Sequence, residues 1–373
     1  MSSFPRARVL VERLERENDK GVNREGFVRF DKNERTVPFP YADFKAILDK
    51  IDSECLSSYP DQNILYQKIA KFNVTEVENL LITNGSDSAI KVIFETFINF
   101  GDKVGFLFPT YAMIDVYGKM YGADIKYFQL DNKLVVNVDE IYEFINSGAK
   151  MIILANPNQP SGTIIDDGVL DDIIKECKKN EVIIVLDQAY IDFANIKSRE
   201  HEVESNPYLF LTRTFSKAYG LAGVRLGYII SNKKNIMNMY RVKPYSDINI
   251  LALKAGEYLL ENPKIFQEYV KSVKISKEIL MNYFQKKKIT FHNSNTNFVH
   301  FTFGDEEANE YIYKSLLSNR FLVRRTGDSL PATIKGCIRI TVGPEEQTKE
   351  FIQVLDEIID KYWNLKKWKN LNK

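Results

Sequence analysis

The chain has 373 residues, of which 44% are hydrophobic and 27% are charged, and this composition is typical of a globular protein with two or three domains. Its formal net charge of +1 provides no overall field that would attract nucleic acid or an anionic membrane, and no apolar run is long enough to span a bilayer. The three cysteines and three histidines lack disulfide or metal-ligand spacing, so we expect no metal site. The N-terminus is charged and lacks the apolar segment of a signal peptide, which predicts a cytoplasmic protein.

The first 40 residues are expected to form an arm outside the main domains. Residues 1–20 are charged and amphipathic, and residues 29–40 read as an extended segment because Pro38 and Pro40 disfavour a helix. A helical segment follows at 41–52, then a loop at 55–60 and a second helical segment at 62–72.

From residue 79 onward, short apolar strands alternate with helical segments. The predicted strands cover residues 79–83, 103–108, 124–129, 150–155, 182–186 and 208–211. The predicted helices cover residues 88–100, 111–121, 138–147 and 166–180. Near-continuous apolar strands between helices indicate a mostly parallel sheet that is buried on both faces. Ligands of such sheets bind beyond the carboxyl ends of the strands, so the residues after each strand are candidates for a site.

Polar and aromatic side chains do follow these strands. The Asn-Gly-Ser-Asp turn at 84–87 and the helix after it would make a cup for an anion, although a plain capped helix N-terminus has the same pattern. Tyr111 could stack on a flat ring or fill the core. The turn at 156–162 is rich in amides and prolines. Each feature has an ordinary structural explanation, but together they predict one site.

The stretch 213–228, RTFSKAYGLAGVRLGY, contains the residue that we expect to carry the chemistry. Buried lysine amines form Schiff bases with carbonyls, and Lys217 is the candidate. Thr214 or Ser216, together with Arg225, supplies the hydroxyl and guanidinium groups that a phosphate needs. Pyridoxal 5′-phosphate is a carbonyl cofactor that carries a phosphate. The alternative is a surface lysine followed by a packed strand.

Two residues after the strand at 182–186 would tune that cofactor. A buried carboxylate beside the pyridine nitrogen keeps this nitrogen protonated, and Asp187 is placed for that role. Tyr190, three residues further on, could form a hydrogen bond to the phenolic oxygen of the ring. The alternative for Asp187 is a helix cap.

Six motifs together resemble the class I and II (fold type I) pyridoxal-phosphate aminotransferases, and within them the histidinol-phosphate aminotransferase and threonine-phosphate decarboxylase branch. The motifs are NGSD at 84–87, FPTY at 108–111, NPNQPSG at 156–162, DQAY at 187–190, SKAYGLAGVRLGY at 216–228 and IRITVG at 338–343. The similarity covers nearly the whole chain. It is specific for the cofactor and the fold, and weakly specific for the substrate.

The resemblance implies roles around the cofactor ring. Lys217 would hold the cofactor as a Schiff base and move protons, Asp187 would pair with the pyridinium, and Tyr190 would bond to the phenolic oxygen. Tyr111 would stack on the ring. The residues implied around the phosphate are Gly85, Ser86, Asp87, Ser216 and Arg225.

The resemblance also implies a homodimer with a site at the subunit interface. Tyr59 resembles a tyrosine that reaches the phosphate in the partner subunit. Arg339, in IRITVG, resembles the arginine that binds the substrate α-carboxylate, and Arg324 stands where relatives place an arginine on a distal phosphate.

Two departures from the family pattern concern the site. The amide before Pro160 is Gln159 where relatives have asparagine, so either Gln159 or Asn158 would bond to the phenolic oxygen. Relatives commonly read Asn-Glu-Asn-Pro where this chain has Asn33-Glu34-Arg35, on a segment that lines the substrate pocket. We expect Asn33 in this pocket, and Arg35 either joins Arg324 on a substrate phosphate or forms surface salt bridges.

The implied fold is α/β, with two domains and an arm. Residues 41–247 would form the large cofactor-binding domain, with a mostly parallel seven-stranded sheet. Residues 248–373 would form an interdomain helical stretch and a smaller α+β domain on which the arm, residues 1–40, packs. The expected elements of the second part are helices at 248–287 (interrupted near Pro263), 306–319 and 345–363, and strands at 297–303, 321–324 and 336–342.

The implied activity is transfer of an amino group between an amino acid such as glutamate and a small phosphorylated carbonyl compound. Decarboxylation of a phosphorylated amino acid, O-phosphoserine or O-phosphothreonine, needs almost the same residues and stays open. A non-catalytic cofactor-binding module is a remote alternative, because such regulators usually carry a separate DNA-binding domain.

Overall fold

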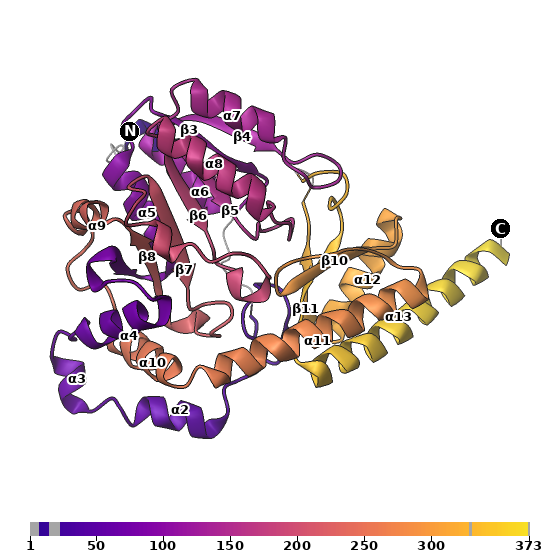
Figure 1. Cartoon of the computed structure of the whole chain (residues 1–373). Helices are drawn as coiled ribbons and strands as arrows, with labels where there is room; N and C mark the ends of the chain where they lie inside the picture. Colours follow the sequence, from indigo (N-terminus) through magenta and orange to yellow (C-terminus); the bar gives the residue numbers. More distant parts are fainter. Residues whose placement is uncertain (1–6, 15–22, 328–329, 372–373) are drawn as a thin grey trace, which may run out of the picture.

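Strands and helices alternate along the first two thirds of the chain and build one large sheet, and a smaller lobe follows it (Figure 1). The computed structural model describes residues 7–14, 23–327 and 330–371, with side chains as far as residue 366. The predicted arm at residues 1–20 therefore lies partly outside the described residues, which place the short helix α1 (Val9–Glu12) there. Across the described ranges, none of the helices has both the length and the apolar character needed to cross a bilayer.

The large sheet has seven strands in the order β2-β8-β7-β6-β5-β3-β4, and only β8 runs antiparallel to its neighbours. Its strands are β2 (Leu80–Thr83), β3 (Lys103–Phe108), β4 (Asp124–Gln129), β5 (Met151–Ala155), β6 (Ile183–Asp187), β7 (Leu209–Thr214) and β8 (Gly227–Ser231). The predicted mostly parallel seven-stranded sheet is confirmed. The carboxyl ends of β2, β3, β5, β6 and β7 share one edge with the start of β8.

Helices cover both faces of this sheet, because successive apolar residues of a strand point to opposite sides. In β6, Val185 packs with the core under α5, α6 and α9, whereas Leu186 packs with the core under α4, α7, α8 and α10. The first group is α5 (Gly85–Phe97), α6 (Ala112–Tyr121) and α9 (Lys233–Tyr240). The second group is α4 (Asn63–Asn73), α7 (Val138–Asn146), α8 (Asp167–Lys179) and α10 (Ile250–Glu261).

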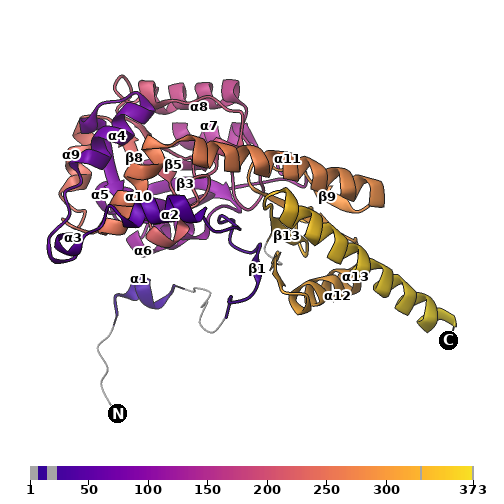
Figure 2. The ribbon, with the colours of Figure 1, turned by 90° about the horizontal axis from the view of Figure 1, so that it is seen from below.

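The smaller lobe is built on a four-stranded antiparallel sheet in the order β12-β13-β10-β9. The long helix α11 leads from the large sheet into this lobe (Figure 2), where it packs against α13. The strands are β9 (Thr290–His292), β10 (Phe298–Thr302), β12 (Arg324–Arg325) and β13 (Ile338–Thr341), and the helices are α11 (Lys264–Lys287), α12 (Glu306–Ser318) and α13 (Glu345–Leu371). The sequence did not indicate β9.

The segment before the large sheet is tied to the lobe by backbone hydrogen bonds. The strand β1 (Val28–Arg29) pairs in parallel with β11 (Phe321–Leu322), and the N–H of Thr341 donates to the carbonyl of Phe30 at 2.9 Å. The chain then enters the short helices α2 (Tyr41–Leu48) and α3 (Ser53–Ser57), which precede α4. Residues 30–33 thus lie next to the lobe strand that carries Arg339.

Two element boundaries differ from the prediction in ways that affect the site. Helix α5 begins at Gly85, three residues earlier than expected, so Ser86 and Asp87 lie in its first turn. An acidic side chain in that turn complements the helix dipole. Strand β7 continues to Thr214, three residues further than expected, because it pairs with β8 as far as the Thr214–Gly227 pair. Sequence periodicity does not report such pairing.

Candidate active site

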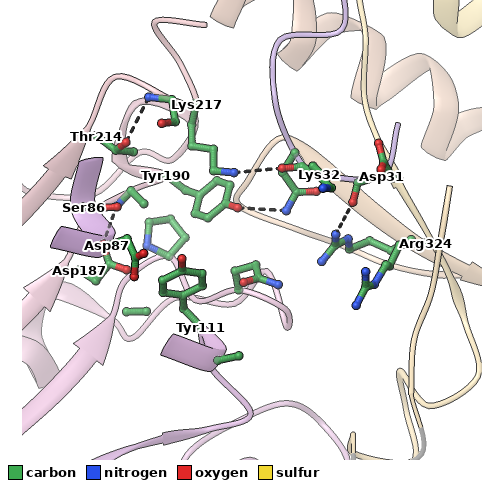
Figure 3. A pocket seen from close by; sticks show the side chains of 18 of the residues that line it. Asp31, Lys32, Ser86, Asp87, Tyr111, Asp187, Tyr190, Thr214, Lys217 and Arg324 are labelled. Atoms are coloured by element: carbon green, nitrogen blue, oxygen red, sulfur yellow. Dashed lines mark hydrogen bonds between the residues drawn. The ribbon is translucent and has the colours of Figure 1, made fainter. Parts of the chain in front are cut away.

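A cavity of about 450 Å³ lies between the carboxyl edge of the large sheet and the face of the small sheet (Figure 3). Three parts of the chain line it: the strand ends of the large sheet, the segment at residues 31–33, and the lobe strands that carry Arg324 and Arg339. The predicted site residues that line it are Asn33, Ser86, Asp87, Tyr111, Gln159, Asp187, Tyr190, Thr214, Ser216, Lys217, Arg225, Arg324 and Arg339. Within the described residues, no group of three or more His, Cys, Asp or Glu side chains is placed to hold a metal ion.

Lys217 reaches into this cavity from the loop after β7. Its Nζ donates a hydrogen bond to the carbonyl oxygen of Lys32 at 3.1 Å and lies 5.5 Å from the centre of the Tyr190 ring. Thr214, at the end of β7, accepts a hydrogen bond from the N–H of Ser216 at 3.1 Å, which shapes the turn that presents the lysine. The amine is therefore held by a single backbone carbonyl at the edge of the cavity.

Asp187 ends β6 and is only 5% exposed. Burial raises the pKa of its carboxyl group to about 6, and hydrogen bonds from Thr212 and Ala189 and the charge of Lys217 offset part of this rise. The hydroxyl of Thr212 donates at 3.0 Å and the N–H of Ala189 at 3.3 Å. Thr212 is the residue opposite Asp187 in the register of β6 and β7, and sequence reasoning missed it because register is a tertiary property. A cation at this position would relieve the buried carboxylate.

A second end of the cavity is suited to an anion. Arg225 donates through Nη1 to the hydroxyl of Ser216 and to the carbonyl of Ala222, both at 3.3 Å. It lies against the N-terminus of the 13-residue helix α5, and a Cβ on Gly85 would stand 2.8 Å from its Nη2. Free N–H groups of a helix start, a hydroxyl and a guanidinium form a phosphate site.

Gly227 allows this arrangement and was not singled out from the sequence. A Cβ there would lie 2.6 Å from both the carbonyl carbon of Gly85 and the nitrogen of Ser86. Any side chain at position 227 would push the start of α5 away from β8. The adjacent Asp87 accepts a hydrogen bond from the hydroxyl of Tyr117 at 2.9 Å, a partner that the sequence also did not reveal.

The side walls of the cavity are aromatic and amide groups. Tyr111 precedes α6, and burial raises the pKa of its phenol far above the usual value, so this hydroxyl stays neutral. Asn158 is 2% exposed and is engaged elsewhere: it donates to the carbonyl of Pro109 at 3.0 Å and to Ser161 at 2.9 Å. Of the two alternatives for the phenolic oxygen, only Gln159 lines the cavity.

The lobe contributes two guanidinium groups. Arg324 and Arg339 are opposite one another in the register of β12 and β13, so both side chains leave the same face of the small sheet. Arg339 is 8% exposed, and its Nη2 donates to the carbonyl of Asp31 at 2.7 Å. Burial, together with the nearby charge of Arg324, lowers the pKa of this guanidinium to about 10. Two neighbouring cations facing a cavity favour an anionic ligand.

Besides Gly85 and Asn158, two further predicted residues, Arg35 and Tyr59, do not line the cavity of this chain. The guanidinium carbon of Arg35 lies 4.6 Å from the centre of the Phe39 ring and 4.3 Å from that of Tyr269, and its Nε donates to the carbonyl of Val37. The predicted clamp of Arg35 and Arg324 on one phosphate is therefore not formed here. Tyr59, in the loop after α3, is 88% exposed and also lies outside the cavity.

Known proteins match this chain over most of its length. The family model described as "Aminotransferase class I and II" matches residues 26–355. A histidinol-phosphate aminotransferase from Methanocaldococcus jannaschii is 31% identical over 348 residues, which are 91% of each chain.

Solved structures share the fold. The histidinol-phosphate aminotransferase from Sinorhizobium meliloti in complex with pyridoxal-5′-phosphate superimposes with a TM-score of 0.85 at 21% identity, and covers 97% of this chain and 99% of its own. The L-threonine-O-3-phosphate decarboxylase from Porphyromonas gingivalis gives 0.73 at 22% identity, over 89% and 99%. The predicted fold class, cofactor and aminotransferase activity are confirmed, and the chain belongs to the class I and II aminotransferases.

Proposed function

We propose that this enzyme transfers an amino group between an amino acid donor, such as glutamate, and a small phosphorylated carbonyl compound, as histidinol-phosphate aminotransferases do. The observation that carries the substrate class is the pair Arg324 and Arg339, which faces the cavity opposite the strand ends of the large sheet. One guanidinium would bind the α-carboxylate and the other the distal phosphate. The similarity to histidinol-phosphate aminotransferases over most of the chain supports this proposal.

The residues of the cavity fit pyridoxal phosphate, which supplies, when bound, an aldehyde that bonds to an amine and a cationic ring that withdraws electrons. The buried carboxylate of Asp187 matches a protonated ring nitrogen. The helix start at Ser86, with Ser216 and Arg225, matches the phosphate. Tyr111 would flank the ring, and Gln159 and Tyr190 would approach its phenolic oxygen.

The chain's own residues then control binding and proton movement. Lys217 would hold the cofactor until the amino group of an amino acid takes the place of its Nζ. The freed Nζ would then take the proton from the α-carbon of the substrate and deliver it to the cofactor. Asp187 would hold the proton on the ring nitrogen during this exchange. The lobe arginines would orient the substrate so that the α-hydrogen faces Lys217.

We also propose that the enzyme is a cytoplasmic homodimer in which Tyr59 reaches the phosphate of the partner subunit. Large apolar side chains are exposed on α2, on α3, in the loop after α3 and in the loop before α10: Tyr41 is 76%, Leu56 79%, Tyr59 88% and Tyr245 84% exposed. Exposed side chains of this size are typical of a surface that a partner covers. Cys55, Cys177 and Cys337 form no disulfide, as expected in a reducing compartment.

The test of the proposed function begins with the cofactor. Protein incubated with pyridoxal phosphate should show a visible absorbance band, and borohydride should erase it and label the peptide that contains Lys217. The Lys217→Ala variant should lose roughly a thousand-fold or more in transfer rate. A variant that keeps its rate would overturn the assignment of this lysine.

The substrate class is tested on the loaded enzyme. Glutamate should convert the band to that of the amine form, and histidinol phosphate should react much faster than histidinol. Release of carbon dioxide from O-phosphothreonine or O-phosphoserine alone, without conversion by glutamate, would instead establish the decarboxylase. Equal rates with phosphorylated and dephosphorylated substrates would contradict the assignment of the arginine pair.

A further inference from the structure

Three buried side chains form a hydrogen-bonded row from the lobe to the cofactor side of the cavity. Thr341 on β13, Asn33 on the segment before α2 and Tyr190 after β6 are 0%, 2% and 5% exposed. The hydroxyl of Thr341 lies 3.2 Å from Oδ1 of Asn33, and Nδ2 of Asn33 lies 3.0 Å from the hydroxyl of Tyr190. Figure 3 shows the Tyr190 end of this row, next to Lys217.

The direction of these hydrogen bonds follows from the number of hydrogens that each group can donate. The Thr341 oxygen accepts the backbone N–H of Asn33 at 3.0 Å, and its single hydrogen is donated to Oδ1 of Asn33. If the amide were turned over, this buried hydrogen would face an NH₂ group and lose its acceptor, which is unfavourable. The NH₂ group of Asn33 therefore faces Tyr190, whose oxygen accepts and whose own hydrogen is left for another partner.

The backbone holds Asn33 in this position. Its φ is +56°, a left-handed conformation that asparagine tolerates better than most residues. Its carbonyl accepts a hydrogen bond from Nδ2 of Asn297 at 3.1 Å, just before β10. Both anchors belong to the lobe, and Thr341 is two residues from Arg339 on the same strand. The strand that carries the substrate arginine thus also orients the amide on Tyr190.

We infer that Thr341 and Asn33 are positioning residues that make the Tyr190 hydroxyl a hydrogen-bond donor toward the phenolic oxygen of the cofactor. This inference rests on the proposed function. A donated hydrogen bond stabilises negative charge on that oxygen and so lowers the proton affinity of the cofactor held on Lys217. Among the described residues, the titratable groups that interact with Tyr190 are Lys217, Tyr111 and Arg339, and Asp187 lines the same cavity; all of them are unchanged in the variants below.

The test is a pH titration of the absorbance of the loaded enzyme. In Asn33→Asp a carboxylate replaces the amide and takes the Tyr190 hydrogen, so the midpoint should rise by about one pH unit. Thr341→Val removes the group that orients the amide and should raise the midpoint by a smaller amount. Thr341→Ser keeps the hydroxyl and should titrate like the wild type.

Two controls separate this role from a general effect on folding. Thr348→Val removes another buried lobe hydroxyl, which donates to the carbonyl of Gly343 and is not connected to Tyr190, and should leave the midpoint unchanged. In a Tyr190→Phe background, Asn33→Asp should produce a smaller shift than in the wild-type background, because only the charge of the new carboxylate then acts on the cofactor. Midpoints of Asn33→Asp and Thr341→Val that equal the wild-type midpoint would overturn the inference. A wild-type protein without a band or a borohydride label would instead overturn the proposed function.

Discussion

The two sheets of this protein present buried charges of opposite sign to the same cavity. The large sheet presents Asp187 from the end of a strand that is buried along its whole length, and burial raises the pKa of this acid. The small sheet presents Arg339 from within a strand, and burial lowers the pKa of this base. Each shift means that the surroundings disfavour the charged form, so a ligand of opposite charge would stabilise each half. The cavity is therefore built for a ligand with a cationic and an anionic part.

The halves also differ in how firmly their residues are held. Asp187 has two hydrogen-bond donors, Thr212 on the neighbouring strand and the N–H of Ala189 in the turn after β6. Arg339 is bonded to the backbone of the segment before α2, and its Nε lacks a partner within the described residues. Arg324 is exposed at the rim of the lobe. The buried carboxylate is thus held by the large sheet and the turn after β6, whereas Arg339 depends on how the lobe meets the chain around residue 31. The following variants probe this contrast.

The largest effect is expected for the unloaded protein when Asp187 becomes asparagine. The folded pKa of about 6 lies above the ordinary value of 3.8, so the folded state binds more protons between these values. This contribution to stability is complete below about pH 4 and is lost as the pH rises through about 6. Asp187→Asn should therefore be more stable than the wild type by about 3 kcal/mol at pH 8. Urea unfolding at pH 8 and pH 4 measures the difference.

The matched control is Asp139→Asn, which changes an exposed carboxylate in the first turn of α7. It should not reproduce the gain at pH 8. A wild-type protein that equals Asp187→Asn in stability at pH 8 would show that burial of this carboxylate is not costly.

A smaller effect is expected on the substrate half. Arg324→Ala should raise KM for a phosphorylated substrate about 10- to 100-fold, because a hydrogen bond between charged groups is lost, and should leave KM for the dephosphorylated analogue unchanged. Arg325→Ala is the control, since this neighbour is bonded to Glu306 at 2.6 Å instead of lining the cavity. An equal rise in KM for the phosphorylated and the dephosphorylated substrate would show that Arg324 does not bind the phosphate.

The smallest effect on catalysis is expected for Arg35. Its guanidinium packs on two aromatic rings, so Arg35→Ala should lower the free energy of unfolding by about 1–2 kcal/mol. KM for phosphorylated substrates should stay within about twofold of the wild type. A large rise in KM would show that Arg35 contacts the substrate after all, for example in the pocket of a partner subunit.

Much of the cofactor half could be predicted because it follows local rules. Apolar strands, the turns after them and the glycines near Arg225 are readable along the chain, and parallel strands bring their carboxyl ends together. Thr212 and Tyr117 could not be found this way, since each contacts its partner across the fold. The sequence is compatible with two roles for Arg35, a phosphate contact beside Arg324 or surface salt bridges, and only the packing of the chain shows that its side chain turns toward Phe39 and Tyr269.

The sequence by itself determined the alternation of strands and helices, the motifs around Lys217 and Asp187, and through them the family, because these depend on residue spacing and on the chemistry of single side chains. Only the tertiary structure decided that Gln159 and not Asn158 faces the cavity, that Gly227 admits the start of α5, and that Thr341 orients Asn33 toward Tyr190. These relations join residues up to 308 positions apart, and strand register and the packing of the lobe on the segment before α2 set them.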